Sequence, residues 1–435
     1  MRRERQAGAA LAAAGLLFAL VATLTPLPGE AYRVPERCMI CGAFGGVDAF
    51  NNVLLFVPLG AGLALAGLRR FAVVALALVL TLTVELLQVA VVTGRDANLG
   101  DVMANTAGGA LGALLAASWR WWLLPAPGAA RALATLAAAA WLGVIAGTGW
   151  ALQREAPAGD YAAQVVPIHV DGYSEYRGRT LAATLDGHPL RPGPLAAADR
   201  VRAELLDERV ALDAWVTTGS MPRRLAPVAI VWGERAGELV ALGQRRYDAV
   251  FRIRQRAARA RLRAPAAVIP GGFPVVPLTA RPDLAPTDTM RVRGGVRDRA
   301  LFVEATLHGR TRRREVPLAP SLGWTLVLPF EYRFGGWLPF LSALWVGGLL
   351  VPFGYWARRG VSSATGHGTV RARRAAWAAA VALLAAGLLL LPALWALHPS
   401  RWWEWGAAAA GVAFGWGAGR WTVRRRGLAA PERDE

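Results

Sequence analysis

The sequence predicts a polytopic α-helical membrane protein of about eight spans with an inserted extracytoplasmic all-β sandwich domain. Two observations predict this fold class: uncharged apolar runs long enough to cross a bilayer occur toward both ends of the chain, and a polar stretch of short apolar runs separates them. Of the 435 residues, 54% are hydrophobic and only 18% are charged, whereas soluble proteins average about 25% charged residues. This composition excludes a disordered chain, and the long uncharged runs exclude a nucleic-acid-binding protein despite the net charge of +19.

Eight apolar segments approach or reach the length of about 17–25 residues that a helix needs to cross the hydrocarbon core. They are approximately Ala7–Thr25, Asn52–Leu68, Phe71–Val92, Val102–Trp119, Ala132–Trp150, Trp337–Trp356, Ala375–Trp395 and Trp405–Trp421. Five of them precede the polar stretch and three follow it. The chain is therefore divided into a five-span bundle (1–150), a sandwich domain (151–335) and three C-terminal spans with a basic tail (336–435).

The distribution of arginine predicts the orientation in the membrane, because cytoplasmic loops carry the excess of positive charge. With the N-terminus inside and the polar stretch left out, seventeen arginines lie on the cytoplasmic side and four on the outer side. Both termini are then cytoplasmic and residues 151–335 extracytoplasmic. Lysine is absent and alanine, arginine and glycine are abundant, as is typical of GC-rich bacterial genomes, so we expect the bacterial inner (plasma) membrane.

The first span has an alternative interpretation as a cleaved signal peptide. A charged N-terminal region, an apolar run and the small residues around Gly29-Glu30-Ala31 fit that pattern loosely. The apolar run is long and the cleavage site is poor, which favours an uncleaved helix. Cleavage would leave the rest of the topology unchanged.

The polar stretch 151–335 contains short apolar runs separated by Gly, Pro and Asp turns, which predicts a sandwich or barrel of many strands. The expected strands are Val165–Val170, Leu212–Thr217, Val228–Trp232, Leu239–Leu242, Val250–Ile253, Leu301–Leu307 and Trp324–Phe330. The stretch has 28 Arg and 19 acidic residues, a local net charge of +9 for which membrane topology gives no reason.

Arginine alternates with other residues from Phe251 to Arg256, which places the arginines on one face of a strand. The alternation continues after a turn or bulge. The full set is Arg252, Arg254, Arg256, Arg259, Arg261 and Arg263. Two interpretations stay open: a solvated strand face, or contact with anionic lipid headgroups or anionic envelope polymers.

Polar side chains gather in the second, third and fourth spans, where they are costly unless they have a function or satisfy one another. Glu85 and Gln88 share a helix face, as do Asp101 and Asn105, and all lie in the outer half of the bilayer. Glycines in the fourth span allow close helix approach and would bring these faces together. The cluster is either a structural network or a pocket for a polar or charged lipid headgroup.

These residues also carry a family resemblance. The pattern Asp48-x3-Asn52-x3-Phe56-x-Pro58-x-Gly60, then Glu85-x2-Gln88, then Arg95-x5-Asp101-x3-Asn105-x2-Gly108-x3-Gly112 resembles the VanZ-like family over roughly residues 10–118. The resemblance implies a cell-envelope role linked to glycopeptide-antibiotic resistance, with no settled biochemical activity. The family's polar positions correspond to Asp48, Asn52, Glu85, Gln88, Arg95, Asp101 and Asn105.

The outer domain resembles the laminin-G/concanavalin-like jelly roll. The segments that carry this resemblance are Leu212–Val216 and Val228–Trp232. The resemblance implies a fold that often binds glycans, usually through Ca²⁺ or exposed aromatic residues. No cluster of Asp and Asn makes a convincing Ca²⁺ site in this sequence, so sugar binding does not carry over from the fold alone.

The remaining signals give no catalytic or metal site. Cys38 and Cys41 in the first outer loop favour a local disulfide in an oxidising compartment, and a redox role stays open. His169, His188 and His308 are interpreted as surface or turn residues. We expect no metal and no cofactor, since neither a Ser/His/Asp array, a P-loop nor a Rossmann glycine pattern occurs at a strand-to-helix junction.

The predicted function is recognition of an envelope lipid or glycolipid at the outer leaflet. The expected partners are membrane lipids, glycolipids or anionic envelope polymers, and no nucleic acid. The alternative is a membrane-embedded enzyme or lipid-handling protein in which Glu85 or Asp101 is a general base or cation ligand and Arg95 clamps a phosphate. A transporter is less favoured, because the polar residues lie near the outer face and no inverted repeat is visible.

Overall fold

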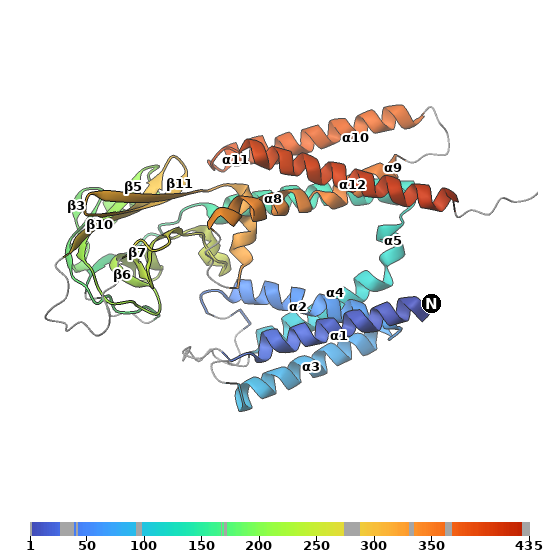
Figure 1. Ribbon diagram of the computed structural model, residues 1–435, viewed down its shortest axis with the longest axis horizontal. Coiled ribbons are helices and arrows are strands. Elements are labelled where there is room, and N and C mark those ends of the chain that lie inside the picture. Colours follow the sequence, from blue (N-terminus) through green and yellow to red (C-terminus); the bar gives the residue numbers. More distant parts are fainter. Residues whose placement is uncertain are drawn as a thin grey trace, which may run out of the picture.

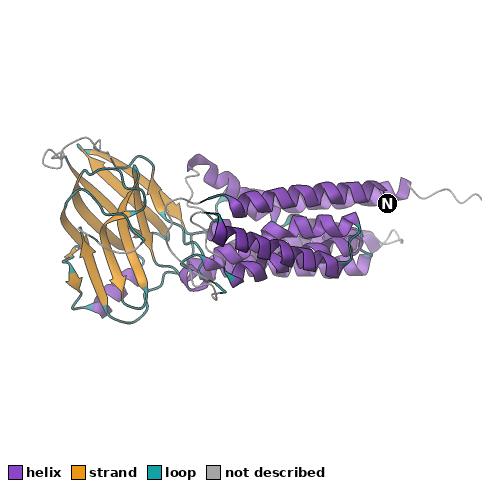
Figure 2. Ribbon diagram, turned by 90° about the horizontal axis from the view of Figure 1, so that it is seen from below, coloured by secondary structure: helices purple, strands orange, loops and turns teal. Residues whose placement is uncertain are grey.

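The computed structural model describes residues 2–26, 39–40, 42–92, 98–166, 168, 172–273, 288–329, 335–361 and 368–428. Long helices run side by side, and a two-sheet β-sandwich lies at one end of them (Figures 1 and 2). The predicted fold class, a helical membrane part with a β-sandwich domain, is confirmed.

The helices occur where the apolar runs predict them. The N-terminal half of the helical part consists of α1 (Arg2–Leu24), α2 (Gly45–Ala66), α3 (Arg70–Ala90), α4 (Leu99–Ala117), the short α5 (Trp119–Leu123) and α6 (Pro127–Leu152). After the sandwich come α8 (Leu338–Gly348), α9 (Val351–Gly360), α10 (Gly368–Ala385), a π-helical turn η5 (Ala386–Leu390), α11 (Leu391–Leu394) and α12 (Trp402–Leu428). α6 packs on α9, and α12 packs on α8 and α9.

Six helical segments of the described chain are long and apolar enough to span a membrane: α1, α2, α3, α6, the pair α8–α9, and α10 continued to Leu394. The predicted number of about eight spans is therefore not confirmed. α4 has 19 residues, and Asp101, Asn105 and four glycines lie among them. These polar and small residues lower its hydropathy while fitting it to close packing against α2 and α3.

Glycines set the spacing between α2 and its two neighbours. A Cβ atom at Gly108 of α4 would overlap the carbonyl oxygen of Val53 in α2, and one at Gly62 would overlap the backbone of Ala12 in α1. Small residues of this kind let backbones approach closely, so that van der Waals contact replaces the hydrophobic driving force that lipid does not supply. The close approach of α2 and α4 brings the polar side chains of both helices within hydrogen-bonding distance.

The sandwich has two six-stranded antiparallel sheets with the orders β4-β1-β6-β7-β8-β9 and β12-β11-β10-β5-β2-β3. The first sheet consists of β1 (Tyr161–Val165), β4 (Gly193–Pro194), β6 (Ala226–Gly233), β7 (Gly237–Arg245), β8 (Asp248–Ile253) and β9 (Ala267–Ile269). The second consists of β2 (Thr180–Leu185), β3 (His188–Pro189), β5 (Val210–Thr217), β10 (Thr289–Arg297), β11 (Ala300–Leu307) and β12 (Arg310–Pro317). A short helix, α7 (Ala198–Leu206), precedes β5.

Five of the seven predicted strands coincide with observed ones, namely β5, β6, β7, β8 and β11. The strand predicted at Val165–Val170 shares only Val165 with β1, which ends there; residues 166 and 168 are not in a strand, and residues 167, 169 and 170 lie outside the described part of the chain. The strand predicted at Trp324–Phe330 is wrong: Pro320–Val327 forms a 3₁₀ helix, η3. Its apolar character has a different cause, because η3 is buried between the sandwich and helices α2, α6 and α8.

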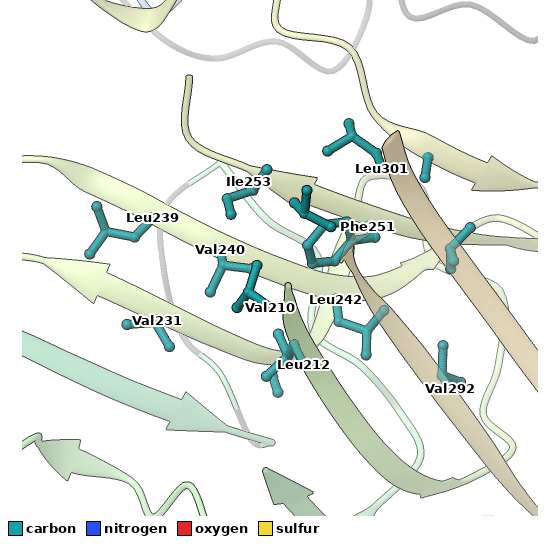
Figure 3. Close-up of a cluster of buried hydrophobic side chains, with 14 of the residues drawn as sticks. Val210, Leu212, Val231, Leu239, Val240, Leu242, Phe251, Ile253, Val292 and Leu301 are labelled. Atoms are coloured by element: carbon teal, nitrogen blue, oxygen red, sulfur yellow. The ribbon is translucent and has the colours of Figure 1, made fainter. Parts of the chain in front are cut away.

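Alternating apolar side chains from both sheets meet between them and form the sandwich core (Figure 3). Phe251 of β8 is fully buried, and its ring lies against Gly294 of the facing sheet, where any Cβ atom would overlap it. The labelled neighbours are Val210, Leu212, Val231, Leu239, Val240, Leu242, Ile253, Val292 and Leu301.

The sandwich is held against one end of the helices by backbone contacts. The N–H of Gly46, at the start of α2, donates to the carbonyl of Arg261 at 3.2 Å, and Arg154, just after α6, forms a β-bridge with Gln255. On the other side, the N–H of His398, between α11 and α12, donates to the carbonyl of Leu318 at 2.9 Å. The predicted orientation makes this the outer end of the helices.

Candidate functional site

A chain of hydrogen bonds joins three helices at the sandwich end of the bundle. The amide of Asn52 on α2 donates to Oδ1 of Asp101 on α4 at 2.6 Å, and the amide of Asn98 donates to Oδ2 of Asp101 at 2.8 Å. The backbone N–H of Asn98 in turn donates to Oε2 of Glu85 on α3 at 2.9 Å. We call Asn52, Glu85, Asn98 and Asp101 the polar network. Sequence spacing predicted this meeting of α2, α3 and α4.

Asn98 is the member of the polar network that the sequence did not single out. It is the N-cap of α4, and its side-chain oxygen accepts the N–H of Asp101 at 2.9 Å. Asn is among the favoured N-cap residues, and an acidic residue three positions later is a variant of the capping-box pattern. An Asn-x-x-Asp signal at the start of an apolar run was therefore present, and it fixes Asp101 between Asn98 and Asn52.

Two buried amides adjoin the polar network. The Nδ2 of Asn105 on α4 donates to the hydroxyl of Thr81 at 2.9 Å, and the Nε2 of Gln88 on α3 donates to the carbonyl of Thr23 on α1 at 2.9 Å. Asn105 is 1% exposed and Gln88 is 6% exposed. The Oδ1 of Asn105 and the Oε1 of Gln88 have no hydrogen-bond donor in the described part of the chain. An unpaired buried acceptor costs about 1–3 kcal/mol, so both oxygens favour a further hydrogen-bond donor.

The other predicted site residues are placed differently. Asp48 lies in the first turn of α2, where its side chain is exposed. Asn51 connects α2 to the junction, because its amide donates to the carbonyl of Val327 in η3 at 2.8 Å. Arg95 lies outside the described residues, as do Cys38, Cys41 and His169. The structure therefore places Asn52, Glu85 and Asp101 in one network, with Gln88 and Asn105 beside it.

The predicted arginine row follows a strand only as far as Ile253. Arg256 begins a 3₁₀ helix, η1 (Arg256–Ala260), so the strand alternation predicted beyond that point is wrong. The chain leaves the strand there because it turns under the sandwich toward α2 and α6.

The arginines of this row contact the protein itself. Arg252 pairs with Glu238, and Arg259 pairs with Glu155 at 2.9 Å. Burial opposes the charge of Arg252, but Glu238 and Tyr173 together outweigh it and raise the pKa of the guanidinium. Arg263 lies over the ring of Phe44 at 4.0 Å from its centroid and donates to the carbonyl of Leu328 at 3.0 Å. Much of the row therefore fixes the junction between the sandwich and the helices.

Metal ligation finds no support in the described residues, where no group of three or more His, Cys, Asp or Glu side chains converges. His188 lies 3.6 Å from Glu204, and His308 lies 3.3 Å from Asp288 on the surface of the sandwich. The polar network can therefore act through hydrogen bonds and carboxylate charge.

Comparison with known proteins supports the N-terminal assignment. Residues 15–121 match the model of the family described as VanZ/LLP1. This match contains the polar network and confirms the resemblance that its residues predict. No curated protein and no solved structure matches the chain, so the likeness of the sandwich to laminin-G/concanavalin-like jelly rolls stays a prediction. The six candidate spans and the family match together identify a multi-pass membrane protein.

Proposed function

We propose that this chain, VanZ-like over residues 15–121, binds the polar headgroup of an envelope lipid or glycolipid at the outer leaflet. The polar network of α2, α3 and α4 is the proposed binding site. The family resemblance adds the expectation that this recognition contributes to glycopeptide-antibiotic tolerance in the bacterial cell envelope.

The position of the polar network supports binding at a membrane surface. It lies where α2 and α4 begin and α3 ends, next to the base of the sandwich, to which α2 is hydrogen-bonded through Gly46 and Asn51. Polar and ionisable groups within spans are expensive and most often mark a ligand pathway. A headgroup at this level would contact the helices while its acyl chains stayed in the bilayer.

The single observation that carries the proposal is a pair of buried acceptors, Gln88 Oε1 and Asn105 Oδ1, that receive no hydrogen bond from the described residues. Both are amide oxygens, which accept hydrogen bonds and carry no formal charge. Both oxygens are buried, so a headgroup reaches them only if the surrounding helices separate locally, and the hydroxyl groups of a sugar would then donate to them. This chemistry favours a glycolipid over a lipid whose headgroup has acceptors alone.

The alternative, catalysis by Glu85 or Asp101 with Arg95, is less well supported by the geometry. Both carboxylate oxygens of Asp101 accept amide N–H groups, and Oε2 of Glu85 accepts a backbone N–H. These hydrogen bonds take up part of the acceptor capacity that a general base would use. A binding role needs no change in these contacts.

The test measures binding of a monoglucosyl diacylglycerol, and of the same diacylglycerol without its sugar, to the purified full-length protein by native mass spectrometry. We expect the sugar to strengthen binding and Asn105→Leu to weaken it by about tenfold, the effect of losing one hydrogen bond. Glu85→Gln and Asp101→Asn should alter binding without any chemical conversion of the lipid.

Ser118→Ala is the matched control, because Ser118 caps the opposite end of α4 and is exposed. It should bind the glycolipid like the unmodified protein, and thermal unfolding of each variant checks that it is folded. Equal binding of the two lipids, or of Asn105→Leu and the unmodified protein, would refute the proposal. Conversion of the glycolipid that disappears in Glu85→Gln would favour the enzymatic alternative instead.

A further inference from the structure

A depression of about 340 Å³ on the outer face of the second sheet lies outside every site described above. Three arginines, one aspartate and a phenylalanine ring line it. Apolar residues at the start of β5 and at the end of β10 complete the lining. The lining residues are Asp186, Arg209, Val210, Ala211, Arg293, Val296, Arg297 and Phe302. We call this the arginine pocket.

Phe302 lines the arginine pocket, and Gly295 lies beside it on the neighbouring strand. They face each other across β10 and β11, and a Cβ atom at Gly295 would overlap the backbone of Val210 and crowd the Phe302 ring. The Phe302 ring therefore occupies the space that a side chain at position 295 would need. Arg293 and Arg297, two positions to either side of Gly295 on the same strand face, place their guanidiniums 5.8 and 5.4 Å from the ring centroid.

The arginine pocket has an excess of positive charge, with three arginines and one aspartate in its lining. Neighbouring arginines on this face are paired, Arg291 with Asp213 and Arg313 with Glu304. Within the described part of the chain, Arg209, Arg293 and Arg297 have no carboxylate at ion-pair distance. The one carboxylate in the lining, Asp186, accepts the N–H of Ala211 at 2.8 Å and interacts electrostatically with Arg293, beyond ion-pair distance. Like charges this close are costly unless an anion joins them, and guanidiniums match phosphate geometry.

The arginine pocket also lies at the end of the sheet that faces the helices. Arg297 is next to the β10–β11 turn, where Arg299 donates to the carbonyl of Leu397 between α11 and α12 at 3.2 Å. One strand residue advances about 3.3 Å, so the backbone of Arg297 lies at most about 7 Å from that of Arg299. Trp402 and Trp337, at the same ends of α12 and α8, are 85% and 67% exposed, as expected of aromatic side chains at a membrane interface.

From this juxtaposition of unpaired guanidiniums and membrane surface, we propose that the arginine pocket binds the phosphate of an anionic phospholipid headgroup in the outer leaflet. Arg293 and Arg297 clamp the phosphate above the Phe302 ring, and Arg209 approaches from the start of β5. This site is separate from the polar network and does not depend on the proposed glycolipid recognition.

The test titrates the purified full-length protein in a neutral detergent with water-soluble dioctanoyl phosphatidylglycerol. We expect Arg293→Gln/Arg297→Gln to lower the affinity at least about tenfold, because charge-assisted hydrogen bonds are lost, and added salt to lower the affinity of the unmodified protein. Arg293→Lys should retain part of the binding. Arg310→Gln, an exposed arginine at the far end of the same sheet, is the control and should bind normally.

Inorganic phosphate distinguishes the two sources of the anion. Weak competition by millimolar phosphate supports a lipid phosphate as the ligand, whereas phosphate binding as tight as that of the lipid overturns the lipid assignment. Unchanged lipid affinity in a folded Arg293→Gln/Arg297→Gln variant, checked by thermal unfolding, also overturns the proposal. Asn105→Leu should leave this affinity unchanged, which separates a failure here from a failure of the proposed glycolipid site.

Discussion

Gly108→Leu is expected to abolish the packing of α2 on α4 and, with it, the accumulation of folded protein in the membrane. A side chain at this position would meet the carbonyl oxygen of Val53 and the Cβ atom of Phe56. Backbone atoms of a packed helix cannot rotate away as a side chain can, so the helices must separate. Overpacking costs about 1–3 kcal/mol where side chains can adjust, and we expect more than that here.

The measurement is the yield of monodisperse protein after detergent extraction, followed by size-exclusion chromatography of a fluorescent fusion. Gly143→Leu on α6 is the matched control, since nothing lies within 4 Å of a Cβ atom there. The variant at Gly108 should lose most of its monodisperse peak while the control keeps it. A Gly108→Leu protein with a normal peak and normal thermal stability would mean that α2 and α4 are not packed as described.

Phe251→Ala is expected to destabilise the sandwich by about 3–5 kcal/mol, the usual cost of removing a buried phenylalanine. The ring is fully buried between the sheets against Gly294, so the facing backbone cannot collapse onto an alanine without moving a whole strand. Hydrogen–deuterium exchange of the full-length protein reports this locally. Where exchange requires unfolding of the sandwich, amides of β8 and β10 should exchange about 10²–10⁴-fold faster.

Tyr247→Ala is the control for this prediction, because Tyr247 lies in the turn between β7 and β8 with 49% of its surface exposed. Surface substitutions of this kind usually change stability by about 0.5 kcal/mol or less. Similar exchange rates in the Phe251 and Tyr247 variants would contradict the assigned core.

Sequence patterning predicted the elements whose apolar residues face a single environment, either lipid or the core of the sandwich. The helices were predicted because lipid demands an uncharged apolar run, and β5 because core and surface side chains alternate along it. β12 was missed because six of its eight residues are exposed and four are arginines, which leaves no apolar alternation. η3 was mistaken for a strand because its apolar residues are buried by three helices and the sandwich together.

The candidate site shows the same limit. Helical spacing placed Glu85 and Gln88 on one face, and the structure brings that face to Asp101 through Asn98. The spacing did not predict that both oxygens of Asp101 are occupied, because a cap forms only once the loop before α4 is in place. The ion pairs of the arginine row could not be predicted either, since Arg259 pairs with Glu155 about a hundred residues away.

These pairs also locate the excess charge of the sandwich. Arg252 pairs with Glu238, and Arg254 and Arg259 share Glu155, so half of the six arginines in the row contact a carboxylate of the sandwich or of the segment after α6. The arginine pocket, which sequence alternation did not mark, holds three guanidiniums and one carboxylate at the end of the sandwich toward the helices. Its residues come from β5 and the residue before it, from β10 and β11, and from the turn after β2, and only folding brings them together.

Recognition at the outer leaflet requires that the sandwich lie outside the cytoplasm, and cysteine labelling tests this most directly. In a Cys38→Ser/Cys41→Ser background, Leu181→Cys places a thiol on the sandwich surface and Leu68→Cys places one between α2 and α3; both side chains are exposed. A membrane-impermeant maleimide should label Leu181→Cys in right-side-out vesicles and Leu68→Cys only in inverted vesicles. The opposite pattern would place the sandwich, the polar network and the arginine pocket at the cytoplasmic face and contradict both proposed lipid sites.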